Sequence, residues 1–198
     1  MKAALDDPTL TIPWSELLTA ARWHDVGKAH EVFQKMLTNP LLPNNPQKFG
    51  GPWAKSDHKK GRPDRKHFRH ELASALALLL HKESDLAAYL AASHHGKVRL
   101  SIRSLPDEEV PLDGQRFARG VWEGDELPGV DLGDGITTQM LSLTLSFMEM
   151  GEGPHGPSWL ERTLRLRDDY GPFRLAWMET LVRVADWRGT AKEGEANA

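Results

Sequence analysis

Four histidines and two aspartates in this chain have the residue types and the settings that suit a metal site. In chain order they are His24, Asp25, His70, His94, His95 and Asp186. Imidazole nitrogens and carboxylate oxygens are ligands that Mn, Fe, Co, Ni or Zn accept. The chain contains no cysteine, so thiolate sites are excluded, and the absence of thiolates argues against a purely structural zinc.

The spacing of apolar residues places some of these polar groups on buried helix faces. Leu17, Ala21 and His24 fall at positions i, i+4 and i+7 of an expected helix, and a second expected helix has Ala87, Leu90, Ala91 and His94 at positions i, i+3, i+4 and i+7. A single histidine on an apolar face is more often hydrogen-bonded within the core than a ligand. Burying several imidazoles and carboxylates without partners is costly, however, and a shared cation would satisfy them. Six such side chains are too many for one ion that also keeps water, and they could nearly make a two-metal site with a bridging aspartate.

The hydrophobic pattern predicts an all-α fold, a helical bundle of about seven helices joined by long irregular loops, and it shows no sustained strand period. The expected helices cover residues 14–25, 29–37, 67–82, 84–94, 136–150, 158–166 and 173–187. His24, His94 and Asp186 are then expected at helix ends and His70 near a helix start. Gly27 is the expected C-cap of the first helix.

The chain is expected to form a single domain over residues 1–198. Three segments stand apart by composition: a basic loop at 38–66, an acidic Pro/Gly-rich insertion at 97–135 and a polar tail at 190–198. The basic loop is either a solvated loop or one that contacts phosphate. The acidic insertion is either a variable surface insertion or a lid or partner-docking surface.

The net charge of −3 means that nucleic-acid binding would depend on local basic patches. The candidate nucleic-acid-binding residues are Lys59, Lys60, Arg62, Arg65, Lys97 and Arg99. Other classes are disfavoured, because the chain has no zinc-protease His-Glu-x-x-His motif, no phosphate-binding loop and no Gly-x-Ser-x-Gly elbow. No apolar run approaches the length of a membrane span and no signal peptide is recognisable, so we expect a cytoplasmic protein without a membrane partner.

At these residues the chain resembles the HD superfamily of metal-dependent phosphohydrolases, which are all-helical proteins. It most resembles the HD nuclease domain of the CRISPR-associated nuclease-helicase of type I systems. The motifs that carry the resemblance span positions 24 to 190 and are His24-Asp25-Val26-Gly27-Lys28, Arg69-His70-Glu71, His94-His95-Gly96 and Ala185-Asp186-Trp187-Arg188-Gly189-Thr190.

The resemblance implies that the six histidines and aspartates bind one or two divalent transition-metal ions. Mn, Fe, Co or Ni are expected, and Mg or Zn less so. It further implies two catalytic residues, with Asp25 as the bridging ligand and Lys28 near the scissile phosphate. The implied substrate is single-stranded DNA, cleaved in CRISPR interference, an antiviral defence. The implied partners are a helicase domain or subunit and an RNA-guided surveillance complex.

One departure from the family concerns the number of ligands. Family members usually carry a further histidine on a helix upstream of the His-Asp pair, and here no histidine precedes His24. That ligand is lost, or a group such as His30 or His67 replaces it, or the chain is a piece of a longer protein whose helicase lies outside it. Two alternatives to a nuclease remain: an HD phosphohydrolase acting on nucleotides, and a catalytically silent HD module that docks a partner.

Overall fold

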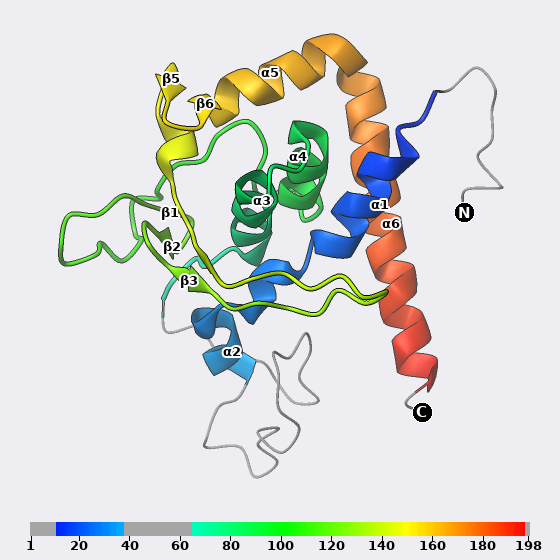
Figure 1. Cartoon of the computed structure of the whole chain (residues 1–198), viewed down its shortest axis with the longest axis horizontal. Coiled ribbons are helices and arrows are strands. Elements are labelled where there is room, and N and C mark those ends of the chain that lie inside the picture. Colours follow the sequence, from blue (N-terminus) through cyan, green and yellow to red (C-terminus); the bar gives the residue numbers. More distant parts are fainter. Residues whose placement is uncertain (1–10, 38–64, 197–198) are drawn as a thin grey trace.

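The computed structural model of the chain describes residues 11–37 and 65–196, with side chains up to residue 192. Two buried helices, α3 (His70–Leu80) and α4 (Asp85–Ser93), pack side by side at its centre (Figure 1). Both are rich in leucine and alanine, which favour helix and allow close approach of the two backbones. Ser84 caps α4, its hydroxyl accepting a hydrogen bond from the Ala87 N–H at 3.1 Å.

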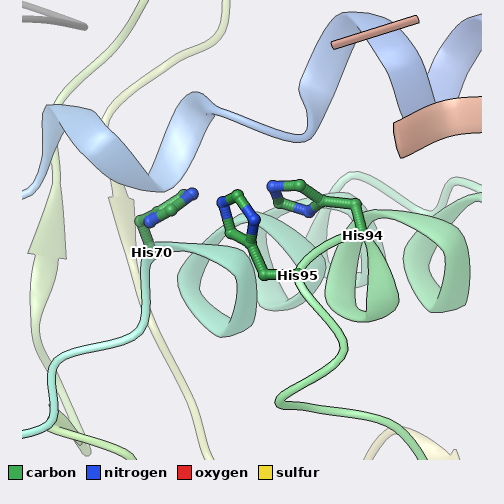
Figure 2. Close-up of side chains that lie close together, drawn as sticks. All are labelled: His70, His94 and His95. Atoms are coloured by element: carbon green, nitrogen blue, oxygen red, sulfur yellow. The ribbon is translucent and has the colours of Figure 1, made fainter. Parts of the chain in front are cut away.

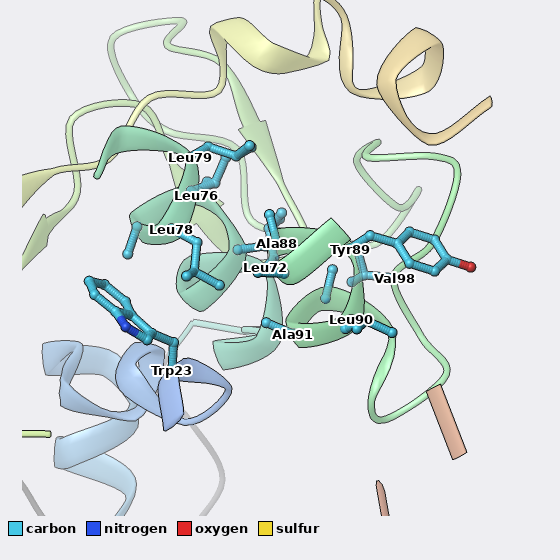
Figure 3. Packing of buried hydrophobic residues seen from close by; sticks show 14 of the residues in the cluster. Trp23, Leu72, Leu76, Leu78, Leu79, Ala88, Tyr89, Leu90, Ala91 and Val98 are labelled. Atoms are coloured by element: carbon cyan, nitrogen blue, oxygen red, sulfur yellow. The ribbon is translucent and has the colours of Figure 1, made fainter. Parts of the chain in front are cut away.

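Three further helices surround this central pair. They are α1 (Trp14–Trp23), α5 (Trp159–Tyr170) and α6 (Pro172–Ala196). In Figure 1, α5 crosses the top of the molecule and α6 descends alongside α1, which packs against both α4 and α6. Figure 3 shows the core between them, where Trp23 of α1 faces Leu78 of α3, and Leu90 and Ala91 of α4 lie to the right. The predicted all-α class is confirmed, and the helix count is close to the seven expected.

A tight turn joins α1 to the rest of the molecule. After α1 the chain forms the 3-10 helix η2 (Val26–Ala29) and then α2 (Glu31–Leu37). Gly27 is not the C-cap of α1 as predicted, because His24 takes that position. Instead, this position has no space for a side chain, because a Cβ at Gly27 would lie 2.0 Å from the backbone oxygen of His70. Close approach of η2 to the start of α3 therefore depends on this residue.

Short strands replace one predicted helix. They form three antiparallel pairs: β1 (Phe117–Ala118) with β2 (Val121–Trp122), β3 (Glu126–Leu127) with β4 (Leu141–Ser142), and β5 (Glu152–Gly153) with β6 (Gly156–Pro157). The helix predicted over 136–150 is wrong, since β4 and a single 3-10 turn, η4 (Ser146–Met148), occupy that range. Leu141, Leu143 and Leu145 follow the two-residue period of an extended chain, and the three threonines of this segment disfavour a helix.

The β3–β4 hairpin is a long arm. It runs from the side of the strands towards α1 and α6 (Figure 1), and Arg22 of α1 donates a hydrogen bond to Asp134 near its tip at 2.6 Å. The acidic insertion predicted at 97–135 thus supplies β1, β2, β3 and the first part of this arm.

Helix α6 is longer than predicted at its carboxyl end. The polar tail predicted from residue 190 is helical as far as Ala196, because its alanine, lysine and glutamate residues favour helix and no proline interrupts them. Asp186 consequently lies within α6 and not at its end. Within residues 11–37 and 65–196, no helix combines the length and hydropathy that crossing a membrane requires.

Candidate metal centre

The ends of three helices and the middle of a fourth bring the six predicted ligands together. His24 is the C-cap of α1 and Asp25 follows it, His70 is the first residue of α3, and His94 is the C-cap of α4. Figure 2 shows the rings of His70, His94 and His95 turned towards one another. The centroid of the His95 ring lies 3.9 Å from that of His94 and 5.1 Å from that of His70.

Two groups of ligand atoms share His94. Donor atoms of His70, His94 and His95 lie within 4.8 Å of one another, and so do donor atoms of His24, Asp25 and His94. The two oxygens of Asp25 connect the groups, because Oδ2 lies 3.4 Å from His24 Nε2 and Oδ1 lies 3.4 Å from His70 Nε2.

Asp186 completes the cluster from α6. Its Oδ1 lies 3.4 Å from His24 Nε2. All six residues predicted as ligands are therefore neighbours, and their coordination of metal remains a prediction.

Backbone carbonyls orient two of the histidine rings. Nδ1 of His24 donates to the Ala21 carbonyl at 2.7 Å, and Nδ1 of His94 donates to the Ala91 carbonyl at 2.6 Å. A proton on Nδ1 leaves the lone pair on Nε2, which is the atom that each ring presents to the cluster. Such outer hydrogen bonds fix the tautomer and the orientation of metal-binding histidines.

Two further side chains hold the backbone of the site. The buried Ser74 hydroxyl donates to the His24 carbonyl at 2.7 Å and accepts from the Gly27 N–H at 2.8 Å, which ties the His-Asp turn to α3. From α6, Arg183 Nε donates to the His94 carbonyl at 2.8 Å. Both residues were missed in the sequence, although a lone serine four residues after His70 on an otherwise apolar helix is a recognisable signal.

Burial and neighbouring charges move the histidine pKa values in opposite directions. The pKa of His94 is lowered to about 3, chiefly by burial and also by the neighbouring histidines, which together outweigh the hydrogen bond to Ala91. Burial also lowers the pKa of His95. Burial lowers that of His24 too, but the hydrogen bond to Asp186 and the charge of Asp25 outweigh it, so the pKa of His24 is raised.

Both carboxylates are held in the charged form. Burial alone would raise the pKa of Asp25, but the close approach of His70 at 3.4 Å and the charges of His24 and Lys28 outweigh it and keep this pKa well below its usual range. The pKa of Asp186 is lowered chiefly by its hydrogen bond to His24. The lowered pKa values of His94, His95 and both aspartates favour neutral imidazoles beside ionised carboxylates, which are the protonation states that a metal ion requires, whereas the pKa of His24 is shifted in the opposite direction.

The orphaned atoms of the cluster fit a divalent ion. Among the described residues, Asp25 Oδ1, His70 Nε2 and His94 Nε2 are buried and have no hydrogen-bond partner. Each is a potential ligand atom, and each faces the cluster. Leaving them unpaired is unfavourable, so a nitrogen- and oxygen-ligated transition metal suits the donor set.

Lys28 lies at the edge of this cluster. Its Nζ is 2.6 Å from Asp25 Oδ2, and its side chain is mostly buried on η2. A cation is thus placed beside the carboxylate that connects the two ligand groups.

The two histidines considered as substitutes for the upstream ligand are engaged elsewhere. Nε2 of His30 lies 3.2 Å from Asp125 Oδ2, and Nε2 of His67 lies 2.9 Å from Asp107 Oδ2. Neither belongs to the two ligand groups.

The structure describes three of the six predicted nucleic-acid-binding residues, Arg65, Lys97 and Arg99. Lys59, Lys60 and Arg62 lie outside the described residues. Arg65 is paired with Asp125 at 2.5 Å and stacked 3.8 Å from the Trp122 ring, and Arg99 is paired with Glu179 at 2.8 Å. Lys97 is exposed. Their contacts with nucleic acid stay a prediction, and for Arg65 and Arg99 binding would compete with an existing ion pair.

Comparison with known proteins agrees with this geometry. The family described as "Cas3, HD domain" matches residues 15–193, which is nearly the whole chain. A curated relative, the CRISPR-associated endonuclease Cas3-HD of Pyrococcus furiosus, is 29% identical over 196 residues, covering 88% of this chain and 70% of the relative. No solved structure matches the chain. With its six-residue cluster on a helical scaffold and a match over residues 15–193, the chain belongs to the Cas3 HD-domain family.

Proposed function

We propose that this protein is a metal-dependent nuclease that hydrolyses phosphodiester bonds of single-stranded DNA in CRISPR interference. The observation that carries the proposal is the convergence of four histidines and two aspartates, with three buried ligand atoms left without a hydrogen-bond partner in the described residues. Support also comes from the relative in Pyrococcus furiosus, whose name describes an endonuclease.

The side chains divide into those that hold metal and those that act on phosphate. His24, Asp25, His70, His94, His95 and Asp186 would hold one or two ions of Mn, Fe, Co or Ni. When bound, such an ion supplies a Lewis acid for the phosphodiester and lowers the pKa of water towards neutrality.

We assign the two catalytic roles to Asp25 and Lys28. Asp25 directs one oxygen towards each ligand group, as a bridging carboxylate must. The Lys28 ammonium, held by Asp25, can donate to a phosphate oxygen and offset the negative charge that develops during hydrolysis. Contacts of this kind read no base sequence, so we expect cleavage without sequence preference.

The partners follow from the family and belong to the same proposal. A helicase domain or subunit would supply the single strand, and an RNA-guided surveillance complex would select the target. The described residues contain the nuclease cluster, and unwinding would have to come from elsewhere.

Cleavage by metal-reconstituted protein tests the proposal. Protein stripped with EDTA is given Mn²⁺, Fe²⁺, Co²⁺, Ni²⁺, Mg²⁺ or Zn²⁺ and incubated with circular single-stranded DNA, duplex DNA and a panel of nucleotides. We expect nicking of the circular single strand with the transition metals. Turnover of nucleotides alone would indicate a nucleotide phosphohydrolase, and inertness with every metal would indicate a docking module.

Two substitutions link the activity to the cluster. Asp25→Asn removes the carboxylate that connects the two groups, and His94→Ala removes the imidazole that they share, so each should abolish nicking and reduce bound metal at least about tenfold. His155→Ala serves as the matched control, because it removes an exposed imidazole that stacks on Phe147 away from the cluster. Full metal-dependent activity in either cluster variant would contradict the site.

A further inference from the structure

Glu71 is a buried carboxylate that the proposed chemistry does not use. It follows His70 in the first turn of α3, and only 1% of it is exposed. Its Oε2 lies 3.6 Å from His70 Nδ1, on the side of the ring that faces away from Asp25. Its Oε1 is buried and has no hydrogen-bond partner among the described residues.

His24, His94 and His70 differ in the group that faces their Nδ1 atom. His24 and His94 each donate their Nδ1 proton to the backbone carbonyl three residues earlier, because each stands at the end of a helix. His70 stands at the start of a helix, where no preceding helical carbonyl is available to its ring. The acceptor facing its Nδ1 is Glu71.

We propose that Glu71 is a positioning residue for His70: its carboxylate accepts the Nδ1 proton and keeps Nε2 as the metal-binding atom. The inference rests on the metal site of the proposed function. A carboxylate acceptor also makes the imidazole a stronger ligand than a carbonyl acceptor does. Of these three histidines, His70 would then be the strongest metal ligand.

The charge of Glu71 supports the same role. In the described parts of the chain, no lysine or arginine nitrogen lies within the 4.0 Å of an ion pair with it. A buried carboxylate without a cation is destabilising. Metal bound at His70 Nε2 would make Nδ1–H a better donor to Glu71 and so would compensate for the burial of this carboxylate.

This role and a purely structural role have opposite signatures. If Glu71 serves only packing, its replacement weakens the metal-free fold and leaves metal affinity unchanged. If it positions His70, replacing it relieves a buried charge in the metal-free protein and weakens metal binding. In that case the metal-free fold becomes more stable while the affinity for metal falls.

The experiment uses Glu71→Gln, which keeps an acceptor but not the charge, and Glu71→Leu, which keeps neither. Thermal unfolding of the EDTA-treated chain gives its stability, and titration calorimetry with Mn²⁺ gives the dissociation constant. We expect an unchanged or higher melting temperature for both variants. The dissociation constant should rise about 10- to 100-fold for Glu71→Leu, with Glu71→Gln in between.

Glu108→Gln is the matched control. Glu108 is also buried, and neither of its carboxylate oxygens has a hydrogen-bond partner in the described residues, but it makes none of the contacts of the cluster. Its replacement should leave the Mn²⁺ dissociation constant unchanged. The visible spectrum of Co²⁺-loaded Glu71→Gln should keep the wild-type shape, because no ligand is removed, whereas Asp25→Asn should alter it.

The outcomes separate the inference from the function on which it rests. Wild-type protein that binds no metal overturns both. Wild-type protein that binds Mn²⁺ while the Glu71 variants bind it equally well overturns the positioning role alone. A lowered melting temperature with unchanged affinity assigns Glu71 to packing. An altered Co²⁺ spectrum in Glu71→Gln shows that Glu71 is itself a ligand, which also contradicts the positioning role.

Discussion

His94 is the residue at which the two halves of the cluster meet. It contributes to both ligand groups, is 1% exposed and has a pKa lowered to about 3. Its place was predictable from the sequence, because the spacing from Leu90 and Ala91 puts it on the buried side of α4. The ring orientation was not predictable, because it depends on the Ala91 carbonyl, and neither was the hold of Arg183 of α6 on the His94 backbone.

We expect two arginines near His70, Arg69 and Arg119, to meet phosphate more readily than Arg65 and Arg99, which are already paired. Arg69 donates its backbone N–H to the carbonyl of Arg119 at 2.9 Å, so the two residues are neighbours. Within the described residues, each has a buried Nε with no hydrogen-bond partner and neither forms an ion pair. Adjacent cations without a counter-ion attract an anion.

The backbone at Arg119 adds to this observation. Its φ of 53° lies in the left-handed region that favours glycine, asparagine and aspartate. It occupies the two-residue turn between β1 and β2 with Gly120, where a Cβ would lie 2.4 Å from the backbone of Phe68. The turn therefore packs against the segment that leads into α3, and Arg119 adopts an unfavourable backbone conformation there.

Removing both guanidinium groups should weaken the binding of single-stranded DNA. In Arg69→Ala/Arg119→Ala, the slope of log affinity against log salt should fall by roughly 0.7 for each phosphate that the protein no longer neutralises. Fluorescence anisotropy of a labelled oligonucleotide at several salt concentrations measures the slope. The amount of metal bound by the double variant should equal that of the wild type. Arg167→Ala, which removes an exposed cation paired with Asp168, should bind DNA as the wild type does. An unchanged slope in the double variant would exclude a role for the two arginines in binding phosphate.

At the scale of elements, the helices that carry the site were predictable and their connections were not. The leucine and alanine periods of α1, α3 and α4 indicate buried helices, because one face of each must join the core. The segment 136–150 has as many apolar residues, but they alternate, and its partner strand β3 lies in a segment with no apolar period of its own. Strand pairing depends on contacts distant in sequence, which a local pattern does not contain.

Asp125 links these connections to the elements that carry the site. It accepts hydrogen bonds from Arg65 and from the backbone N–H of Trp122, and it lies 3.2 Å from His30, the residue between η2 and α2. Burial would raise the pKa of Asp125, but the hydrogen bonds from His30 and Arg65 outweigh it, so this pKa is lowered. A lowered carboxyl pKa stabilises the fold above the pKa of the unfolded chain, and that stability is lost as pH falls through the folded pKa.

Asp125→Asn should therefore lower the free energy of unfolding at pH 7 and flatten its fall below about pH 4, the ordinary pKa of an aspartate. Urea unfolding of the metal-free protein between pH 2.5 and 7 measures both effects. Asp168→Asn, in an exposed pair with Arg167, should leave the wild-type pH profile intact. Parallel profiles for wild type and Asp125→Asn would show that the ion pair does not contribute.

At the scale of the whole molecule, the cluster draws on four helices, α1, α3, α4 and α6. Each contributes at least one of the six side chains, so metal bound at the centre should resist the separation of any of them. A ligand that binds only the folded state stabilises it by about 2.7 kcal/mol at a concentration 100 times its dissociation constant. The melting temperature should therefore rise with added Mn²⁺ or Co²⁺ and return to its starting value with EDTA.

Calorimetric scans of the stripped protein at increasing metal concentration measure this rise. His94→Ala should abolish it, whereas His155→Ala should keep it, because only the first removes atoms from the cluster. A wild-type melting temperature that does not respond to any of the metals would contradict a site shared by four helices.

The contact between His24 and Asp186 has a consequence for the chain as a polymer. The two residues are 162 positions apart. An ion held by both would close most of the polypeptide into a ring, as a cross-link does, and the entropy of closing a ring grows with the logarithm of its length. A single cut in the exposed β3–β4 arm would then leave two fragments still joined through the ion. The integrity of this protein would depend on the cluster as well as on the continuity of its backbone.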